Sequence, residues 1–182
     1  NPDINAQTHP YISTGLKDNK FGIAFDKASD IYHNYHKYPN IKFIGIDCHI
    51  GSQLTTLEPF MEALDRLIGL ADQLAEKDGL SIEHLDLGGG LGVTYDNETP
   101  PDPAQLAAKV KQRLAERPYK IILEPGRSIM ANAGILVTKV EYLKEHHEKY
   151  FAIVDAAMND LLRPSLYQAW HNIISVDVNN SH

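Results

Sequence analysis

Short apolar runs alternate with helix-forming segments, and this alternation limits the fold more than any other feature of the sequence. The runs occupy residues 21–25, 41–52, 82–92 and 119–127, and each ends in a glycine-containing or polar cluster. Strands that alternate with helices in this way predict a parallel sheet. Two α/β architectures fit, a doubly wound open sheet and part of a (β/α)₈ barrel, and both place ligands at the C-terminal ends of their strands.

Capping residues predict where the intervening helices begin and end. We expect a first helix at residues 27–38, with Asp26 as its N-cap and Pro39 as its stop. Another helix begins at Asp102, which is followed by a proline suited to the first helical turn, and Pro118 ends it.

The longest predicted helix covers residues 57–77 and ends at Gly79. Apolar residues recur along it at helical spacing, so one face is expected to be buried. The predicted inner stripes are Phe60, Leu64, Leu67, Ile68, Ala71 and Leu74 on this helix, and Leu106, Val110 and Leu114 on the helix that begins at Asp102.

After Asn132 the sequence becomes β-rich and contains no long helix. The segments "ILVTKVEYLKE" and "YFAIVDAA" are joined by the short connection "HHEK", which predicts a hairpin. We therefore predict two parts: residues 1–133, which form the α/β part, and residues 134–182, which begin an all-β domain that is incomplete.

Composition excludes some classes of partner and indicates a cellular setting. A net charge of -7 makes nucleic acid and anionic membrane surfaces poor partners, and no apolar run approaches the roughly 18 residues of a membrane span. Cys48 is the single cysteine and has no internal disulfide partner, which fits a reducing cytoplasm. Because the chain begins at Asn1 and not at Met, we expect a fragment of a longer protein.

The motif "DLGGGLG" contains Gly88, Gly89 and Gly90 at the end of a predicted strand. It matches neither the dinucleotide-binding fingerprint nor a P-loop. Two interpretations stay open: a phosphate cradle built from backbone N–H groups, and a tight turn between strand and loop.

The motif "CHIGSQ" places His49 and Ser52 at the end of another strand. A histidine there can stack on a flat ring or act as an acid or base, whereas no second ligand at suitable spacing supports a metal site. Cys48 is expected to be a packing residue, because neighbouring strand side chains point to opposite faces.

A third cluster, "LEPGRSIMANAG", follows residues 121–123, which we expect to be buried on both faces. Pro125 and Gly126 force a turn between Glu124 and Arg127. The pair is either a surface ion pair or an anion site beside an acid.

A fourth cluster, "MNDLLRPSLY", contains Arg163 and Tyr167. Arginine binds carboxylates through two parallel hydrogen bonds. The alternative is an arginine paired with Asp160 in a loop.

Together, the first three clusters suit a flat cofactor that bears a phosphate. Pyridoxal phosphate needs a cradle for its phosphate, a partner for its ring and a carboxylate to keep its pyridine nitrogen protonated.

The stretches "HIGSQ", "LDLGGGLG", "EPGRSIMANAG" and "DAAMNDLLRPSLYQAWH" resemble the diaminopimelate decarboxylases, which are pyridoxal phosphate enzymes of the alanine-racemase-like barrel group. "THPYISTG", near the start, is similar to the same family. The resemblance implies the C-terminal half of a pyridoxal phosphate-binding (β/α)₈ TIM barrel, followed by the start of an all-β C-terminal domain.

The resemblance also implies roles for individual residues. His49 would stack on the cofactor ring, and Glu124 would hold the proton of the pyridine nitrogen. Arg127 would contact both the phosphate side of the site and the substrate. The remaining implied cofactor contacts are Ser52, Gly88, Gly89, Gly90, Pro125 and Gly126, and the implied contacts to the distal end of the substrate are Arg163 and Tyr167.

Two motifs of the family are absent from this sequence: the Tyr-Ala-x-Lys-Ala context of its Schiff-base lysine, and the Cys-Glu-Ser motif contributed across a dimer interface. We therefore expect a homodimeric parent enzyme that decarboxylates meso-diaminopimelate to lysine, and a fragment that is inactive alone. Two alternatives remain: a related decarboxylase acting on ornithine, arginine or carboxynorspermidine, and a non-catalytic module that binds a phosphate-bearing ligand.

Overall fold

The computed structural model describes residues 1–5, 15 and 20–177. The chain forms two compact units, and each is described separately below. The first unit comprises Asn1–Val93 and Thr99–Ala131, and the second comprises Thr94–Glu98 and Asn132–His182.

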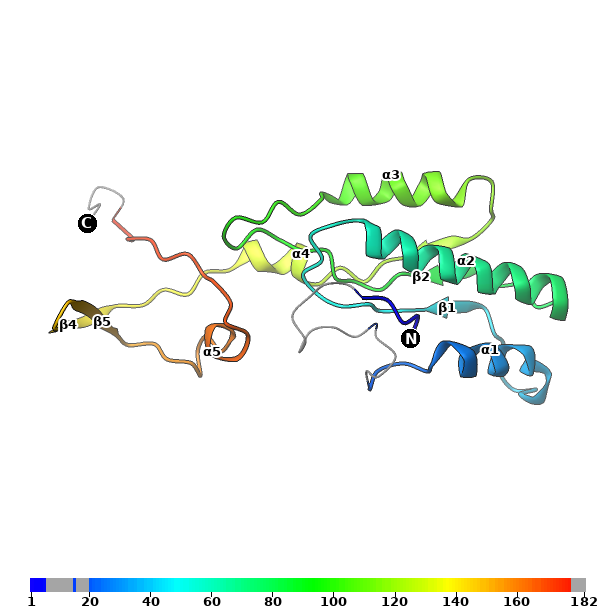
Figure 1. Ribbon diagram of the computed structural model, residues 1–182, viewed down its shortest axis with the longest axis horizontal. Coiled ribbons are helices and arrows are strands. Elements are labelled where there is room, and N and C mark those ends of the chain that lie inside the picture. Colours follow the sequence, from blue (N-terminus) through cyan, green and yellow to red (C-terminus); the bar gives the residue numbers. More distant parts are fainter. Residues whose placement is uncertain (6–14, 16–19, 178–182) are drawn as a thin grey trace. The chain divides into compact units, whose positions relative to one another are not determined.

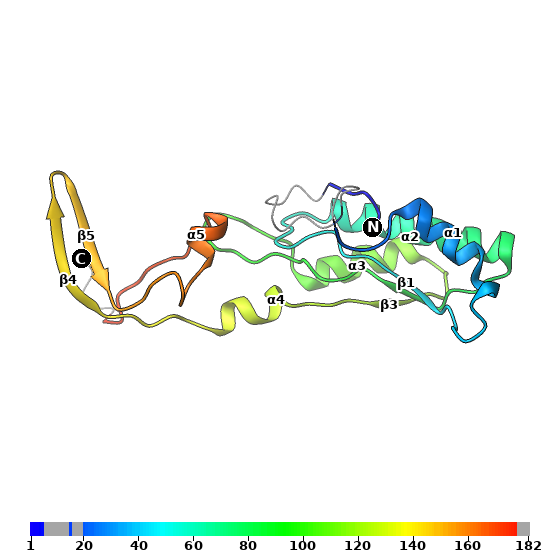
Figure 2. The ribbon, with the colours of Figure 1, turned by 90° about the horizontal axis from the view of Figure 1, so that it is seen from below.

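The first unit is a parallel sheet covered by helices (Figure 1). Helix α2 packs against strands β1 and β2, and helices α1 and α3 both contact α2. Figure 2 shows the same three helices along the strands from another side. The elements of the first unit are α1 (Phe25–His33), η2 (Tyr35–Lys37), β1 (Gly45–Asp47), α2 (Glu58–Asp78), β2 (His84–Asp86), α3 (Pro103–Leu114), β3 (Lys120–Ile122) and α4 (Arg127–Met130).

Strand register divides the sheet into two faces. The strand order is β1-β2-β3, and Ile46, Leu85 and Ile121 lie side by side across it. These three residues belong to or pack against the core beneath α2. Their successors along each strand point to the other face, because strand side chains alternate. The parallel α/β arrangement predicted from the alternating pattern is therefore confirmed.

The predicted helices exist, with shifted ends. The apolar stripe and the C-terminal stop of α2 are as expected: its six stripe residues are buried, and Gly79 ends the helix with φ +66°. Asp102 caps α3 through a reciprocal pair with Gln105, but α3 ends at Leu114, four residues before Pro118, where Ala115 leaves helical geometry.

The expected boundaries of the first helix were wrong. Helix α1 begins at Phe25 with Ala24 as its N-cap, so Asp26 lies inside the first turn. There its carboxylate interacts favourably with the positive end of the helix dipole. The helix ends at His33, and a separate 3₁₀ turn, η2, leads to Pro39.

Residues 21–25, the weakest of the four apolar runs, form no strand. Gly22 adopts φ +70°, which interrupts an extended chain, and the carbonyl of Ile23 accepts a hydrogen bond from the Asn1 amino terminus at 2.7 Å. The aromatic ring of Phe25 instead packs from α1 against the core.

The expectation that residues 121–123 are buried on both faces was also wrong. Ile122 is 42% exposed and Leu123 is 43% exposed. Ile121 packs against the hydrophobic core, whereas Ile122 points to the opposite face of the sheet, which is exposed at this position.

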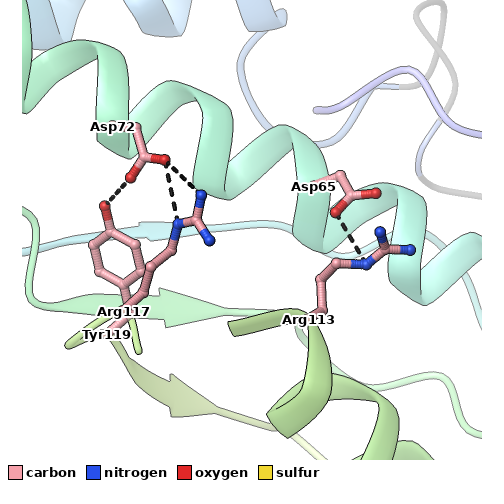
Figure 3. Close-up of polar contacts among 5 residues, drawn as sticks. All are labelled: Asp65, Asp72, Arg113, Arg117 and Tyr119. Atoms are coloured by element: carbon pink, nitrogen blue, oxygen red, sulfur yellow. Dashed lines mark hydrogen bonds and ion pairs between the residues drawn. The ribbon is translucent and has the colours of Figure 1, made fainter. Parts of the chain in front are cut away.

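A polar brace ties the outer helices to the sheet (Figure 3). The Asp72 carboxylate on α2 accepts hydrogen bonds from the Tyr119 hydroxyl at 2.6 Å and from Nε and Nη2 of Arg117 at 3.3 Å. Arg113 on α3 pairs with Asp65 on α2 at 3.3 Å. Burial, followed by the hydrogen bond to Asp72, raises the pKa of Tyr119 to about 12.

The second unit contains the predicted hairpin. Strands β4 (Val140–His146) and β5 (Lys149–Val154) pair antiparallel. The unit is not wholly β, because residues after the hairpin form helix α5 (Arg163–Tyr167), whose Pro164 suits a first helical turn. A short 3₁₀ turn, η3 (Ala131–Ala133), lies where the two units meet in sequence. Within the described residues, no helix combines the length and hydropathy needed to cross a bilayer.

Candidate active site at the carboxyl edge of the sheet

The three parallel strands end at one edge of the sheet, and the polar clusters that follow them contact one another there. The N–H of Gly89, after β2, donates to Nδ1 of His49, after β1, at 3.2 Å. The N–H of Glu124, after β3, donates to the carbonyl of Gly88 at 2.9 Å. Three segments that are far apart in the sequence therefore form one cluster.

The glycines of the β2 loop allow this close approach. Gly88 has φ +64°, and a Cβ atom there would lie 2.6 Å from the Cys48 carbonyl oxygen. A Cβ on Gly89 would overlap the carbonyl of Glu124, and one on Gly90 would overlap the carbonyl of Gly51. The tight-turn interpretation therefore explains why these positions are glycines, because neighbouring backbone fills the space that a Cβ atom would need.

Among the four glycines of the same loop, one N–H is left as a donor for a ligand. Gly88 N–H bonds Oδ1 of Asp86 at 2.8 Å, Gly89 N–H bonds His49, and Gly92 N–H bonds the carbonyl of Leu54 at 2.9 Å. Within the described part of the chain, the N–H of Gly90 has no acceptor. A phosphate cradle here would therefore use Gly90 as its amide donor.

The segment after β3 turns sharply, as expected from Pro125 and Gly126. Gly126 is the N-cap of α4, and its carbonyl accepts hydrogen bonds from the N–H groups of Ile129 and Met130 at 3.1 Å. The Glu124 side chain is exposed, and the two interpretations of Glu124 and Arg127, a surface ion pair or an anion site beside an acid, stay predictions.

Arg127 contacts a residue that the motif analysis missed. Its Nη1 donates to Oε1 of Gln53 at 3.2 Å. Gln53 follows Ser52 in "HIGSQ" and also bonds both backbone groups of Val93, with Nε2 donating to the carbonyl at 2.5 Å and Oε1 accepting from the N–H at 3.2 Å. Only its place directly after Ser52 marks it in the sequence.

Carboxylates gather beside the cluster, and the sequence analysis did not select them. Asp47 and Asp86 occupy equivalent positions on β1 and β2. Burial raises the pKa of Asp47, and the negative charges of Asp86 and Glu124 raise it further, while His49 opposes this. Cys48 beside them is 4% exposed, and burial raises the pKa of its thiol to about 12, so it packs as a small apolar residue.

In the second unit, Arg163 is held by two residues that were also missed. Its guanidinium carbon lies 4.2 Å from the centroid of the Tyr95 ring, and Nη1 lies 3.0 Å from Nε2 of His171. The expected alternative, a pair with Asp160, does not form: Asp160 accepts from the N–H of Ala157 instead. Burial, and then the Arg163 charge, lower the pKa of His171. Tyr167 ends α5 and is half-buried.

The groups at the sheet edge fit the chemistry of a flat, phosphate-bearing ring. Ser52 offers a hydroxyl and Gly90 an N–H, which are donors suited to phosphate oxygens. Glu124 offers an exposed carboxylate suited to a protonated ring nitrogen. Among the described residues, no group of three or more metal-ligating side chains occurs. The donor set therefore fits pyridoxal phosphate.

Comparison with known proteins gives the same class. Residues 1–131 match the family described as pyridoxal-dependent decarboxylase, pyridoxal binding domain. The chain therefore belongs to the pyridoxal-dependent decarboxylases. "THPYISTG", which contributed to the resemblance in the sequence, lies outside the described residues except for its last glycine.

Similar individual proteins are diaminopimelate decarboxylases. The chain is 60% identical to that of Vibrio cholerae over 175 residues, 96% of this chain and 42% of the relative. It is 60% identical to that of Pseudomonas aeruginosa over 176 residues, 97% of this chain and 42% of the relative. The crystal structure of the Helicobacter pylori enzyme complexed with L-lysine is similar with a TM-score of 0.88 and 44% identity, over 94% of this chain and 43% of that one. The chain thus spans well under half the length of these proteins.

Proposed function

We propose that the protein carrying this sequence decarboxylates meso-diaminopimelate to L-lysine and CO₂ with pyridoxal phosphate. The observation that carries the proposal is the cluster that joins three strand ends: the N–H of Gly89 donates to His49 at 3.2 Å, and the N–H of Glu124 donates to the carbonyl of Gly88 at 2.9 Å. The 60% identity to diaminopimelate decarboxylases over nearly the whole chain supports the choice of reaction.

The proposal includes a finer fold assignment. Residues 1–133 are the C-terminal half of a (β/α)₈ barrel, and residues 134–182 begin a C-terminal domain that is rich in β-strand and also contains α5. A single packed sheet face supports the first part, because Asp47, Asp86 and Ile122 line the face that a closed barrel would enclose. A homodimeric assembly and a cytoplasmic location are parts of the same proposal.

Each group of this chain has one task toward the cofactor. Ser52 and Gly90 bind the phosphate, together with Arg127, and Gly88 and Gly89 shape the loop that presents Gly90. His49 lies against the ring, and Pro125 and Gly126 turn the chain so that Glu124 follows the strand directly. When bound, the cofactor supplies an aromatic ring that accepts the electron pair left by the departing carboxylate.

Glu124 makes that electron acceptance favourable by holding a proton on the ring nitrogen. Asp47 and Asp86 add negative charge around it; burial raises the pKa of Asp47 most, and the charges of Asp86 and Glu124 raise it further. A carboxylate in such surroundings stabilises a nearby positive charge, which a protonated pyridine nitrogen provides.

Arg163 favours a substrate with a carboxylate at its distal end over one whose distal end carries only a cation. Its guanidinium binds a carboxylate bidentately, whereas the cationic side chains of ornithine or arginine would be repelled. Tyr95 and His171 contact Arg163 from two sides, which limits the directions the guanidinium can take. We infer that Arg163 and Tyr167 bind the distal end of the substrate.

The test measures CO₂ release by the whole protein from meso-diaminopimelate, ornithine, arginine, lysine and carboxynorspermidine. We expect release from meso-diaminopimelate only, with L-lysine as the product. Release chiefly from one of the others would replace the proposed substrate, and no release together with no pyridoxal phosphate binding would leave the non-catalytic module as the better description.

Glu124→Ala tests the role of the carboxylate, with Glu116→Ala as its matched control at another exposed position of the same unit. We expect Glu124→Ala to lower kcat at least 100-fold and Glu116→Ala to leave it unchanged. An unchanged kcat in Glu124→Ala would exclude the assigned role.

A further inference from the structure

Gln53 joins the loops that follow all three strands of the sheet. It lies on the β1 loop, its amide bonds both backbone groups of Val93 on the β2 loop, and its Oε1 accepts from Nη1 of Arg127 after β3 at 3.2 Å.

The bonds to Val93 fix which end of the amide faces Arg127. A glutamine side chain has one donor end and one acceptor end. The carbonyl of Val93 takes the Nε2 donor, and the N–H of Val93 takes one lone pair of Oε1. The second lone pair of Oε1 is therefore held in one direction, and Arg127 is bound there.

The backbone of Gln53 is also constrained. Its φ is +63°, a left-handed conformation that non-glycine residues adopt at a cost. The side-chain bonds to Val93 help to offset that cost, so the position is built around the amide and not around backbone preference.

We infer that Gln53 is a positioning residue that orients the Arg127 guanidinium toward the phosphate of the cofactor, without contacting the cofactor itself. Gln53 takes one of the five N–H donors of the guanidinium, and its fixed Oε1 sets the plane in which the others lie. The inference rests on the proposed function, because it assumes a phosphate-bearing ligand at this edge of the sheet.

The experiment compares two probes, pyridoxal phosphate and pyridoxal, in the whole protein freed of cofactor. Both probes carry the same ring and aldehyde, so the ratio of their Kd values isolates the contribution of the phosphate. Absorbance titration gives both Kd values without any turnover. We expect Gln53→Met to raise the Kd for pyridoxal phosphate about tenfold and to leave the Kd for pyridoxal within about twofold.

A second variant keeps the inference testable if the Gln53→Met protein does not fold. Gln53→Glu keeps an acceptor for Arg127 but neutralises the guanidinium through an ion pair and opposes the carbonyl of Val93. It should lower the preference for pyridoxal phosphate as Gln53→Met does. Gln73→Met is the matched control, because Gln73 is a half-buried glutamine on α2 that bonds only His33 among the described residues. It should change neither Kd.

A double-mutant cycle separates positioning from general support of the loops. If Gln53 acts through Arg127, then Gln53→Met adds no further loss in an Arg127→Met background. Additive losses would overturn the inference, as would a Gln53→Met protein that keeps the full preference for pyridoxal phosphate. A wild-type protein with no preference between the probes would instead overturn the proposed cofactor, which distinguishes the two failures.

Discussion

The N–H of Gly89 donates a hydrogen bond to Nδ1 of His49 at 3.2 Å. Because a backbone N–H only donates, this bond keeps Nδ1 as an acceptor and places a ring proton on Nε2. The imidazole orientation is therefore set by the glycine loop of the next strand, and Gly89 itself has no room for a side chain.

Gly89→Ala should destabilise the first unit. The added Cβ would overlap the carbonyl of Glu124, so the two loops must separate, at a cost of about 1–3 kcal/mol. Urea unfolding followed by circular dichroism measures the change. Gly69→Ala is the matched control: its Cβ meets nothing within 4 Å, and within helix α2 it should stabilise by about 0.5–1 kcal/mol. Equal free energies of unfolding for the Gly89→Ala and Gly69→Ala proteins would contradict the geometry.

His171 should make substrate affinity depend on pH. Burial and Arg163 lower its pKa below 6.5, so the ring is neutral near pH 7 and accepts from Arg163 at Nε2. As the pH falls below 6.5 and through the lowered value, protonation removes that acceptor and places a positive charge beside Arg163. The KM for meso-diaminopimelate should therefore rise on acidification.

Acidification should also lower the free energy of unfolding through His171. The unfolded state binds a proton to His171 at a higher pH than the folded state, so stability from this residue is complete above pH 6.5 and is lost as the pH falls. His171→Gln keeps an acceptor but does not titrate. A KM profile that is equally steep in this variant would assign the pH dependence to another group.

Asp72→Ala should cost more stability than Asp65→Ala. Asp72 accepts from the half-buried Tyr119 hydroxyl at 2.6 Å as well as from Arg117, and its loss leaves that hydroxyl without its partner, at about 1–3 kcal/mol (Figure 3). Asp65 only pairs with Arg113 on the surface, which is worth about 0–1 kcal/mol. Urea midpoints of the two variants, measured side by side, test the order. Tyr119→Phe should reproduce most of the Asp72→Ala loss.

Cys48 should resist thiol reagents in the folded protein. Its side chain is 4% exposed, and burial raises its pKa to about 12, so the reactive thiolate is rare at pH 8. Iodoacetamide at pH 8 followed by peptide mass spectrometry should find Cys48 unmodified in native protein and modified in urea. Labelling of native Cys48 at the rate of a free thiol would show that this part of the core opens readily.

Patterns local in sequence predicted much of the first unit correctly. The stripe from Phe60 to Leu74, the cap at Asp102 and the stop at Gly79 depend on residues three or four positions apart, so they can be identified without knowing the fold. From residue 41 to residue 127, the order of strands and helices followed from the same patterns.

The errors occurred where neighbours distant in sequence decide the outcome. Residues 21–25 are apolar enough for a strand, but the Asn1 amino group and the φ of Gly22 hold them in another conformation. Ile122 lies on an edge strand, and its exposure depends on which face α2 covers.

The sequence by itself determined the α/β class and the polar residue types at each strand end, because both are encoded in local periodicity and motifs. Only the tertiary structure decided which groups work together. It joined Gln53 to Val93 and Arg127, and Arg163 to Tyr95 and His171. These contacts form between residues brought together by strand pairing and chain reversal, and no spacing along the sequence specifies them.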